Sequence, residues 1–140
     1  MFSHDGFREL ARHECLRLMA KVTVGRIVFT RRALPAVLPV NFGQDVDGAV
    51  LLCTSAASDL VRAIDGAVVA FEVDDVDLAR HSGWSVVIVG PAAVVTDPVE
   101  HERLARTGPA SWGPAPDEVF IRIEPELVTG RELVGASTEL

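Results

Sequence analysis

Hydrophobic residues near the start of the chain recur three and four positions apart. The segment FRELARHECLRLMA, residues 7 to 20, carries them near one helical face and most of its charged residues elsewhere. This spacing is typical of an amphipathic helix that packs one face against a core. It predicts a helix over residues 7–20, within a helical N-terminal segment of residues 5–21. The residues on the apolar face are Phe7, Leu10, Ala11, Cys15, Leu18 and Met19.

The pattern then changes to that of strands. VTVGRIVFT, residues 22–30, is rich in β-branched and aromatic residues and predicts a strand, and residues 31–33 are suited to a hairpin connection. The next segment, ALPAVLPVNF, contains Pro35 and Pro39. Because proline has no N–H to donate to a ladder, we expect this strand to run along an edge or a bulge.

The rest of the chain alternates short apolar runs with turn signals. Residues 43–48 predict a turn, and the Asp74–Asp77 run predicts a solvated loop rather than a metal site. We expect the tail to be loose from about residue 134. The remaining predicted elements are strands at 49–54, 66–76, 81–97 (bent or bulged at Gly90-Pro91) and 119–130, and helices at 58–64 and 98–106.

These elements amount to about six short strands with a few short helices between them. Most strands are joined directly by turns, which favours antiparallel pairing over a parallel sheet. Closing the sheet would remove the exposed edges of such Val-rich strands. The sequence therefore predicts a single, mainly β domain over residues 1–140: an antiparallel barrel with small peripheral helices.

Charge and composition exclude some classes of binding partner. The formal net charge is −7, and the basic residues are scattered arginines apart from Lys21, which argues against a nucleic-acid partner. No stretch has the length of a membrane span or the apolar core of a signal peptide. Cys15 and Cys53 fit no paired metal or redox spacing and suit a reducing compartment. We expect a cytoplasmic protein that does not bind a membrane.

No catalytic constellation is visible in the sequence. The four histidines stand in separate elements without a metal-ligand spacing, so we expect no metal site. The GxSxG motif of serine hydrolases is also missing. The catalytic residues therefore stay unidentified at this level.

Three dispersed stretches carry a family resemblance. They are LPAVLPVNF (34–42), LCTSAASDL (52–60) and GWSVVIVGPA (83–92). In this order and at these separations they resemble the flavin-binding split-barrel family typified by pyridoxamine 5'-phosphate oxidase, in particular its small actinobacterial-type members. The leading helix that runs into VGRIVFT and the segment RIEPELVTGREL extend the resemblance over nearly the whole chain.

The resemblance implies a six-stranded antiparallel split barrel of the FMN-binding type. It also implies a homodimer with two equivalent cofactor sites at its interface, each lined by both chains. FMN is the first expectation for the cofactor, with F420, FAD and heme as alternatives. The matching residues are Pro39, Val40 and Asn41 beside the flavin ring, Cys53, Thr54, Ser55, Ser58 and Leu60 around the phosphate, and Trp84 and Ser85 facing the ring or its ribityl chain.

The stretch LCTSAASDL has a second interpretation and a departure from the family. Ser55 or Ser58 would serve equally as the cap of a helix whose dipole Asp59 complements. Asp59, Leu60 and Asn41 also stand where the oxidases carry basic residues. A carboxylate near a phosphate costs on the order of 1 kcal/mol at a wet site. Compensating charges could come from Arg62, Arg26 or an arginine of a second subunit.

Two function classes therefore remain open. One is a flavin- or deazaflavin-dependent oxidoreductase that acts on a small organic substrate. The other is a non-catalytic binding module for flavin, F420 or heme, or a split barrel that has lost its cofactor.

Overall fold

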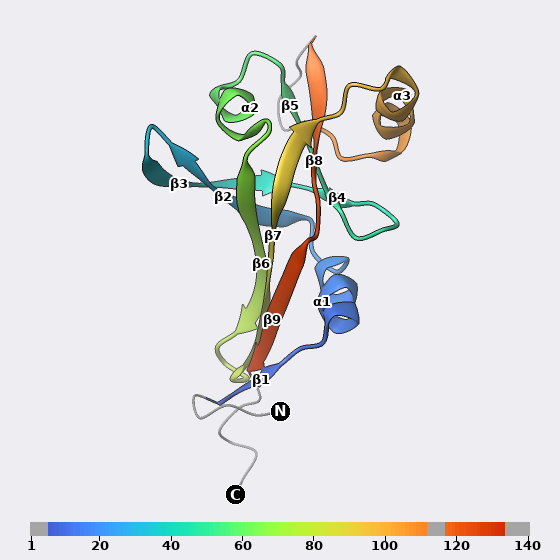
Figure 1. Cartoon of the computed structure of the whole chain (residues 1–140). Coiled ribbons are helices and arrows are strands. Elements are labelled where there is room, and N and C mark those ends of the chain that lie inside the picture. The colour runs from blue at the N-terminus through green and yellow to red at the C-terminus, as the bar shows by residue number, and fades with distance from the viewer. Residues whose placement is uncertain (1–5, 112–116, 134–140) are drawn as a thin grey trace, which may run out of the picture.

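The computed structural model describes residues 6–111 and 117–133, and its main feature is one nine-stranded sheet in which all pairings are antiparallel (Figure 1). The elements in chain order are β1 (Phe7–Glu9), α1 (Arg12–Met19), β2 (Val24–Arg31), β3 (Leu34–Asn41), β4 (Gly43–Gln44), β5 (Val50–Ser55), α2 (Asp59–Ile64), β6 (Val68–Asp77), β7 (Ser82–Val94), α3 (Pro98–Thr107), β8 (Glu118–Ile123) and β9 (Leu127–Leu133).

Strand β7 joins the two parts of the sheet. The strand order is β3-β2-β6-β7-β8-β5-β4, and β9 pairs with β7 and with β1. Along one edge, β7 pairs with β9 over residues 83–89 and then with β8 over residues 92–94. Gly90 lies at this change of partner, where an added Cβ would collide with the backbone carbonyl oxygen of Glu124. The special position that the sequence predicted at Gly90-Pro91 is therefore the point where the strand changes partner.

The mainly antiparallel β architecture is confirmed, but the sheet has nine strands instead of six. Residues 119–130, predicted as one strand, form β8 and β9 with a tight turn between them, in which the N–H of Glu126 donates to the carbonyl of Glu124. Pro125 within this turn has no N–H with which to continue a ladder. Among the described residues no ladder joins β3 to β4, so the predicted closure of the barrel is not observed.

The N-terminal helix is shorter than predicted. Residues 7–9 form β1, paired with β9, and the helix begins only at Arg12. Arg8 binds Glu132 of β9 at 2.8 Å, and the side chain of Glu14 accepts a hydrogen bond from the N–H of Ala11 at 2.8 Å. Pairing with β9 and this cap together outweigh the helical periodicity of the first residues.

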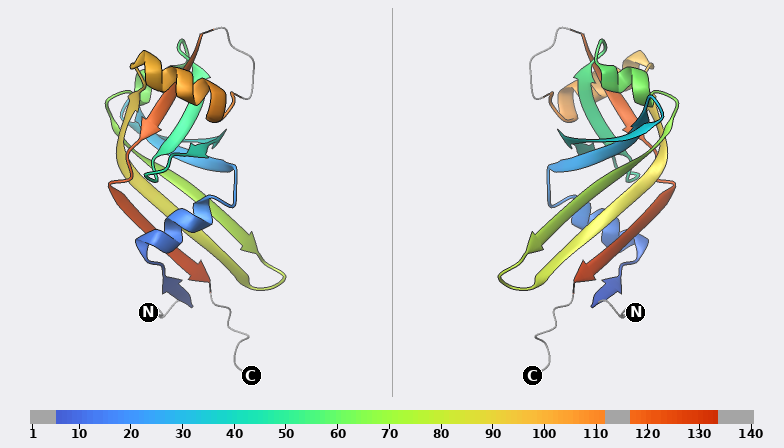
Figure 2. Two further views of the ribbon diagram at one scale, coloured as in Figure 1. Left: turned by 90° about the vertical axis from the view of Figure 1, so that its right-hand side faces the viewer. Right: turned by 90° about the vertical axis from the view of Figure 1, so that its left-hand side faces the viewer.

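The core lies between α1 and the inner face of the sheet. Ile27, Phe71, Ile88 and Val128 form one row across β2, β6, β7 and β9, and the first three are fully buried. Cys15 and Met19 of α1 are buried in the same cluster. In the right-hand view of Figure 2 the opposite face of β6, β7 and β9 points to the viewer, and no helix of the described residues covers it.

Several other local predictions can be compared with the structure. Strand β3, which carries both prolines, lies at the edge of the sheet formed by the described residues and pairs there only with β2. Arg32 and Ala33 form the hairpin turn with positive φ of 52° and 66°. The Asp74–Asp77 run is not a loop but the end of β6, because these residues pair with residues 82–85 of β7. The tail from residue 134 lies outside the described residues. Among the described helices, none combines the length and apolar character needed to cross a membrane.

Candidate functional site

A pocket of about 150 Å³ forms where the ends of β3 and β5 meet α2, and we call it the strand-end pocket. Residues 39–41 of β3 and 52–54 of β5 line it, together with Leu60 of α2 and Ser111 from the segment after α3. The fold thus brings together six of the ten residues predicted for the cofactor site. The lining residues are Pro39, Val40, Asn41, Leu52, Cys53, Thr54, Leu60 and Ser111.

Asn41 fixes the end of β3 against the segment that follows α3. Its Nδ2 donates to the carbonyl oxygen of Ala110 at 2.6 Å. This bond places Ser111, the next residue, at the pocket. Leu52, the first residue of LCTSAASDL, was not among the predicted site residues. Ser111 was not predicted either, because it reaches the pocket through the tertiary contact between β3 and the segment after α3.

The hydroxyl groups of LCTSAASDL organise the start of α2. Ser58 is the N-cap, and its Oγ accepts from the N–H of Val61 at 3.3 Å. The hydroxyl of Thr54 donates to Ser58 Oγ at 3.4 Å. Ser55 binds Asp117 at 3.0 Å and does not line the pocket. The capping interpretation is therefore realised at Ser58, while Thr54 lines the pocket next to the cap.

Cys53 contributes a neutral wall rather than a nucleophile. Burial, with a smaller contribution from the charge of Glu118, raises the pKa of the Cys53 thiol to about 11. A thiol with this pKa stays protonated at neutral pH and behaves as a small apolar group. Together with Pro39, Val40 and Leu60 it makes one side of the pocket apolar.

Trp84 and Ser85 lie elsewhere on the surface of the chain. Both belong to the part of β7 that pairs with β6 and β9, where Trp84 is opposite Asp75 and Glu132. They line two separate hollows, neither of which includes a residue of the strand-end pocket. Within one chain they do not join the other predicted residues, and their role in the cofactor site stays a prediction.

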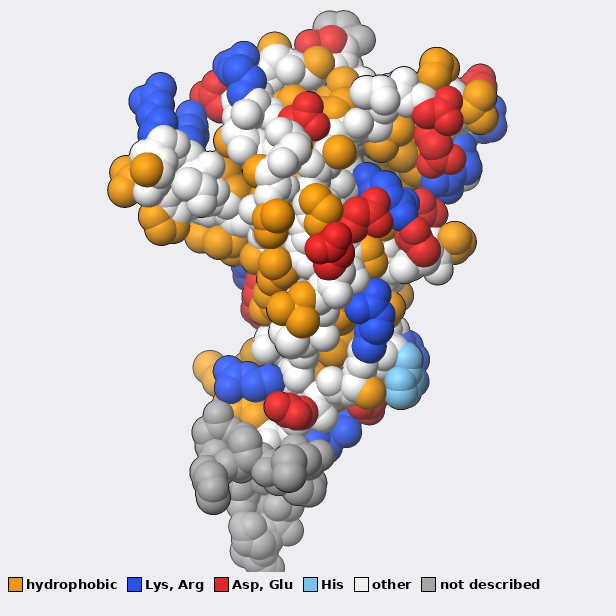
Figure 3. Space-filling model, viewed as in Figure 1, with side chains coloured by type: hydrophobic (Ala, Val, Ile, Leu, Met, Phe, Trp, Pro, Cys, Tyr) orange, Lys and Arg blue, Asp and Glu red, His pale blue; other side chains and the backbone are white. Residues whose placement is uncertain are grey.

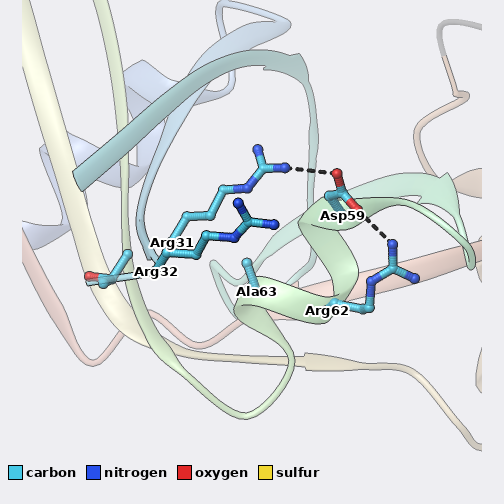
Figure 4. Close-up of a pocket in the computed structure, with 6 residues that line it drawn as sticks. Arg31, Arg32, Asp59, Arg62 and Ala63 are labelled. Carbon is cyan, nitrogen blue, oxygen red and sulfur yellow. Dashed lines mark hydrogen bonds and ion pairs between the residues drawn. The ribbon is translucent and has the colours of Figure 1, made fainter. Parts of the chain in front are cut away.

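A second pocket, of about 350 Å³, lies between the β2–β3 turn and α2, and we call it the arginine pocket. Asp59 at the start of α2 binds Arg31 at 2.7 Å through Oδ2 and Arg62 at 2.6 Å through Oδ1 (Figure 4). The hydrogen bond from Arg62 and the charge of Arg31 hold the pKa of Asp59 below its ordinary value. The pocket is lined by Thr30, Arg31, Arg32, Asp59, Arg62 and Ala63.

The negative charge of Asp59 is therefore offset by arginines, but only one of them was among those predicted. Arg62 pairs with Asp59, whereas Arg26 instead contacts Glu72 at 3.4 Å and Asp74 at 3.3 Å. Arg31 was not anticipated, since the sequence does not show that the hairpin turn reaches α2. The local net charge is +2, from three arginines and one aspartate.

An ion-pair network fixes the position of α3 and therefore of the segment after it, which carries Ser111. Asp45, whose side chain is only 9% exposed, binds Arg103 of α3 at 3.0 Å and Arg122 of β8 at 2.9 Å. Arg122 also pairs with Asp47 and with Glu124. This network ties the β4–β5 connection to both elements.

No group of three or more histidine, cysteine or acidic side chains able to hold a metal ion occurs within the described residues.

Comparison with known proteins gives consistent results. Residues 11–132 match the family model described as pyridoxamine 5'-phosphate oxidase. An uncharacterized protein of Mycobacterium tuberculosis, Rv0080, is 47% identical over 134 residues, which cover 92% of this chain and 87% of that protein.

Two solved structures are similar over nearly their whole length. The FAD-binding protein of Mycobacterium smegmatis has a TM-score of 0.80 at 32% identity, covering 90% of this chain and 98% of the other. A protein of unknown function from Corynebacterium diphtheriae, DIP1874, has a TM-score of 0.76 at 32% identity, covering 93% of this chain and all of the other.

Proposed function

The chain belongs to the pyridoxamine 5'-phosphate oxidase family, and on this premise we propose that it binds a flavin in the strand-end pocket and acts as an oxidoreductase on a small organic substrate. The observation that carries the proposal is the convergence of Pro39–Asn41, Cys53, Thr54 and Leu60 on one pocket. The similarity to an FAD-binding protein supports a flavin as the ligand.

The chemistry of the pocket fits parts of a flavin. The apolar side chains of Pro39, Val40 and Leu60 suit a flat ring, and the neutral Cys53 thiol adds no charge beside it. Thr54 places a hydroxyl next to the capped start of α2, and rotation of this hydroxyl away from its 3.4 Å contact with Ser58 would offer a donor to a phosphate group. A bound flavin supplies the electron-transfer chemistry, so the protein has to bind, orient and shield it. FMN is the form that we predicted, and FAD is the form that the similar protein binds.

We further propose that a second copy of the chain completes the site. A pocket of about 150 Å³ is smaller than ligand pockets of roughly 300–1,000 Å³ and holds only part of a flavin. Large apolar side chains are exposed on the hairpin and on the uncovered sheet face, and Figure 3 shows those of the hairpin. Exposure of several large apolar side chains on these two elements supports an interface there. The exposed residues include Leu34, Val37, Leu38, Val68 and Leu127.

The test of the cofactor is direct. Freshly purified protein should absorb near the flavin bands, or should take up FMN or FAD in a titration followed by flavin fluorescence. Mass spectrometry of the ligand released by denaturation identifies the form. If the protein binds neither FMN, FAD, F420 nor heme, the proposal is wrong.

The test of the site uses a matched pair of variants. Thr54→Val removes the pocket hydroxyl with little change in volume, so we expect flavin affinity to fall about tenfold, the worth of one good hydrogen bond to a charged group. Thr96→Val makes the same change at an exposed position outside the strand-end pocket and should leave affinity unchanged. If both variants bind flavin as tightly as the parent, the phosphate does not contact Thr54.

The non-catalytic alternative is favoured by one observation. Among the described residues that line the strand-end pocket, Cys53 is the ionisable side chain, and its raised pKa of about 11 keeps it from exchanging protons near neutrality. Reoxidation of the reduced holoprotein, followed by absorbance with and without candidate small oxidants, separates the two. Acceleration by a substrate supports an enzyme, and a rate equal to that of free flavin supports a carrier or sensor.

A further inference from the structure

The three residues after the end of α3, numbers 109–111, contact both β3 and β5, and we call them the wall segment. Asn41 at the end of β3 donates through Nδ2 to the carbonyl oxygen of Ala110 at 2.6 Å, and the backbone of Ser111 makes a hydrogen bond with the thiol of Cys53 in β5. Among the described residues no ladder joins β3 to β5. The wall segment therefore connects two strands that are not paired with each other, and it does so at the strand-end pocket.

We propose that Asn41 is a positioning residue of the flavin site: its side-chain amide holds the wall segment as one side of the strand-end pocket, and the segment keeps water from the part of the flavin bound there. The inference rests on the proposed function. It gives the side chain of Asn41 a protein partner, whereas the family resemblance placed this residue beside the ring. Ser111 then joins the residues that contact the ligand.

The direction of the hydrogen bond follows from its acceptor. A backbone carbonyl only accepts, so the amide of Asn41 has its NH2 group turned toward Ala110. Leucine has nearly the shape of asparagine but no donor, and glutamine keeps the amide on a longer side chain. The contact can therefore be removed, or kept, without a change of charge beside an anionic ligand.

The same stretch of chain fixes the wall segment at two further points. Pro109 packs against Gly43, where an added Cβ would lie 3.1 Å from Pro109 Cδ. Two residues later, Asp45 binds Arg103 of α3 at 3.0 Å. Residues 41, 43 and 45 thus contact the wall segment or the helix before it, so the chain that leaves β3 determines where this side of the pocket lies.

The role of this contact is local to the pocket. Pro109 and Ser111 are partly buried, whereas Ala110 between them is exposed. Neither Asn41 nor Ala110 belongs to the hydrophobic core of the described residues. A short segment with few buried apolar contacts opens at a lower free energy than the core does. Losing the hydrogen bond to its central residue should therefore loosen the wall segment and leave the fold intact.

Cys53 reports the position of the wall segment without any ligand. Its thiol lines the strand-end pocket beside Ser111, and burial raises the pKa of this thiol to about 11. Because the thiolate is the form that iodoacetamide alkylates, the reaction is slow while the segment is in place and speeds up when water reaches the sulfur. Cys15 is fully buried in the core and serves as an internal control in the same protein.

The experiment compares Asn41→Leu with Asn41→Gln and with the matched control Gln44→Met. Gln44 also donates its amide to a backbone carbonyl, that of Leu16 at 3.2 Å, but it does not line the strand-end pocket. Peptide mass spectrometry measures the rate at which iodoacetamide alkylates Cys53 in the flavin-free protein. Titration measures the affinities for FMN and FAD, and iodide quenching of the bound flavin's fluorescence measures the access of solvent to the ring.

We expect Asn41→Leu to be alkylated at Cys53 about fivefold faster than the parent and to bind flavin about fivefold more weakly, the worth of one hydrogen bond. Iodide should quench the flavin bound to this variant more strongly than the flavin bound to the parent. Asn41→Gln should lie nearer to the parent in all three measurements, and Gln44→Met should match the parent. Saturation with flavin should slow the alkylation of Cys53 in the parent.

The other outcomes overturn the inference in different ways. If flavin affinity falls in Asn41→Leu while alkylation keeps the parent's rate, Asn41 contacts the ligand itself and does not act through the wall segment. If alkylation speeds up while flavin affinity and quenching stay unchanged, the wall segment does not shield the ligand. Equal effects in Gln44→Met would mean a general loss of stability.

Failure of the proposed function gives a separate result. In that case no flavin binds even to the parent, while Asn41→Leu still speeds the alkylation of Cys53. The flavin site is then wrong, and the anchoring of the wall segment by Asn41 stands.

Discussion

Arg31, at the end of β2, reaches across to Asp59 at the first turn of α2, with 2.7 Å between Nη2 and Oδ2. The two residues are 28 positions apart in the chain. Their contact changes the meaning of Asp59, which in the sequence looked like an obstacle to an anionic ligand. In the structure its charge is already balanced, and it orients the arginines that face the pocket.

Replacing Asp59 therefore strengthens anion binding. In Asp59→Asn the net charge of the arginine pocket rises from +2 to +3, while the amide can still accept from Arg31 or Arg62. We expect flavin affinity to rise about threefold at low salt and to approach that of the parent at high salt. Asp59→Lys should give a larger rise. Calorimetric titration at two salt concentrations measures the effect.

The control for Asp59 is Glu102→Gln, which removes one negative charge from an exposed ion pair of α3. If this variant raises flavin affinity as much as Asp59→Asn, the effect comes from total charge and not from the pocket.

Glu72 makes stability depend on pH near neutrality. Burial, followed by a hydrogen bond with Asp74, raises the pKa of Glu72 from 4.5 to about 7. A carboxyl group with a raised native pKa contributes stability that is full below pH 4.5 and is lost as the pH rises through about 7. At pH 8 the free energy of unfolding of Glu72→Gln should therefore exceed that of the parent by on the order of 1 kcal/mol after solvent screening. Near pH 4.5 the two should be equal. Urea unfolding at both pH values measures the difference.

The exposed Glu126→Gln serves as the comparison for Glu72 and should leave the pH profile of the parent unchanged. A gain in Glu72→Gln that is equal at pH 4.5 and pH 8 would show that the effect is one of packing and not of ionisation.

Asp45 stabilises the chain through its two arginine partners. Burial opposes its ionisation, but hydrogen bonds from Arg103 prevail and hold the pKa of Asp45 below the ordinary 3.8. We expect Asp45→Asn to lower the free energy of unfolding by about 2 kcal/mol at pH 7. Because a depressed pKa gives stability that is lost on acidification, the difference from the parent should shrink below pH 3.8. Urea unfolding at several pH values measures both.

Glu100 provides the matched control, since it pairs with the same Arg103 but its side chain is 45% exposed. Glu100→Gln should cost less than about 1 kcal/mol. Equal losses in the two variants would mean that the burial of Asp45 does not decide its contribution.

Gly90 tolerates no side chain. In Gly90→Ala the new methyl group would collide with the carbonyl oxygen of Glu124, a backbone atom that cannot turn aside. We expect a loss of about 3 kcal/mol or more in urea unfolding. Ala93→Val, at an exposed position of the same strand, should change stability by less than about 1 kcal/mol. A mild effect of Gly90→Ala would mean that β8 and β9 can separate at Glu124 without loss.

What could be predicted from the sequence was local. The cap at Ser58 and the helix after it follow from side chains that act within four residues. The edge position of β3 follows from Pro35 and Pro39, since neither has an N–H to donate. The convergence of Pro39–Asn41 with Cys53, Thr54 and Leu60 came from the family resemblance, and the structure places them around one pocket.

What escaped prediction depends on partners distant in the chain. Residues 7–9 have a helical period, but their backbone groups pair with β9, more than 120 positions away. The segment 119–130 divides at Pro125, and the prediction of one strand missed this because β8 pairs with β5 and the end of β7, whereas β9 pairs with the earlier part of β7. Arg31 gave no sign of reaching α2. In each case the deciding contact is tertiary, and periodicity does not report it.

The length of β7 limits where related chains can gain or lose residues. β7 pairs with β6 over residues 82–91, with β9 over residues 83–89 and with β8 over residues 92–94. Its buried and partly exposed positions alternate without a break from Val86 to Ala92. A single residue inserted near Gly90 would turn every later side chain of the strand to the opposite face. Related chains that gain or lose residues should therefore do so in the connections, at the hairpin turns or around Pro125, and keep the count of β7 constant.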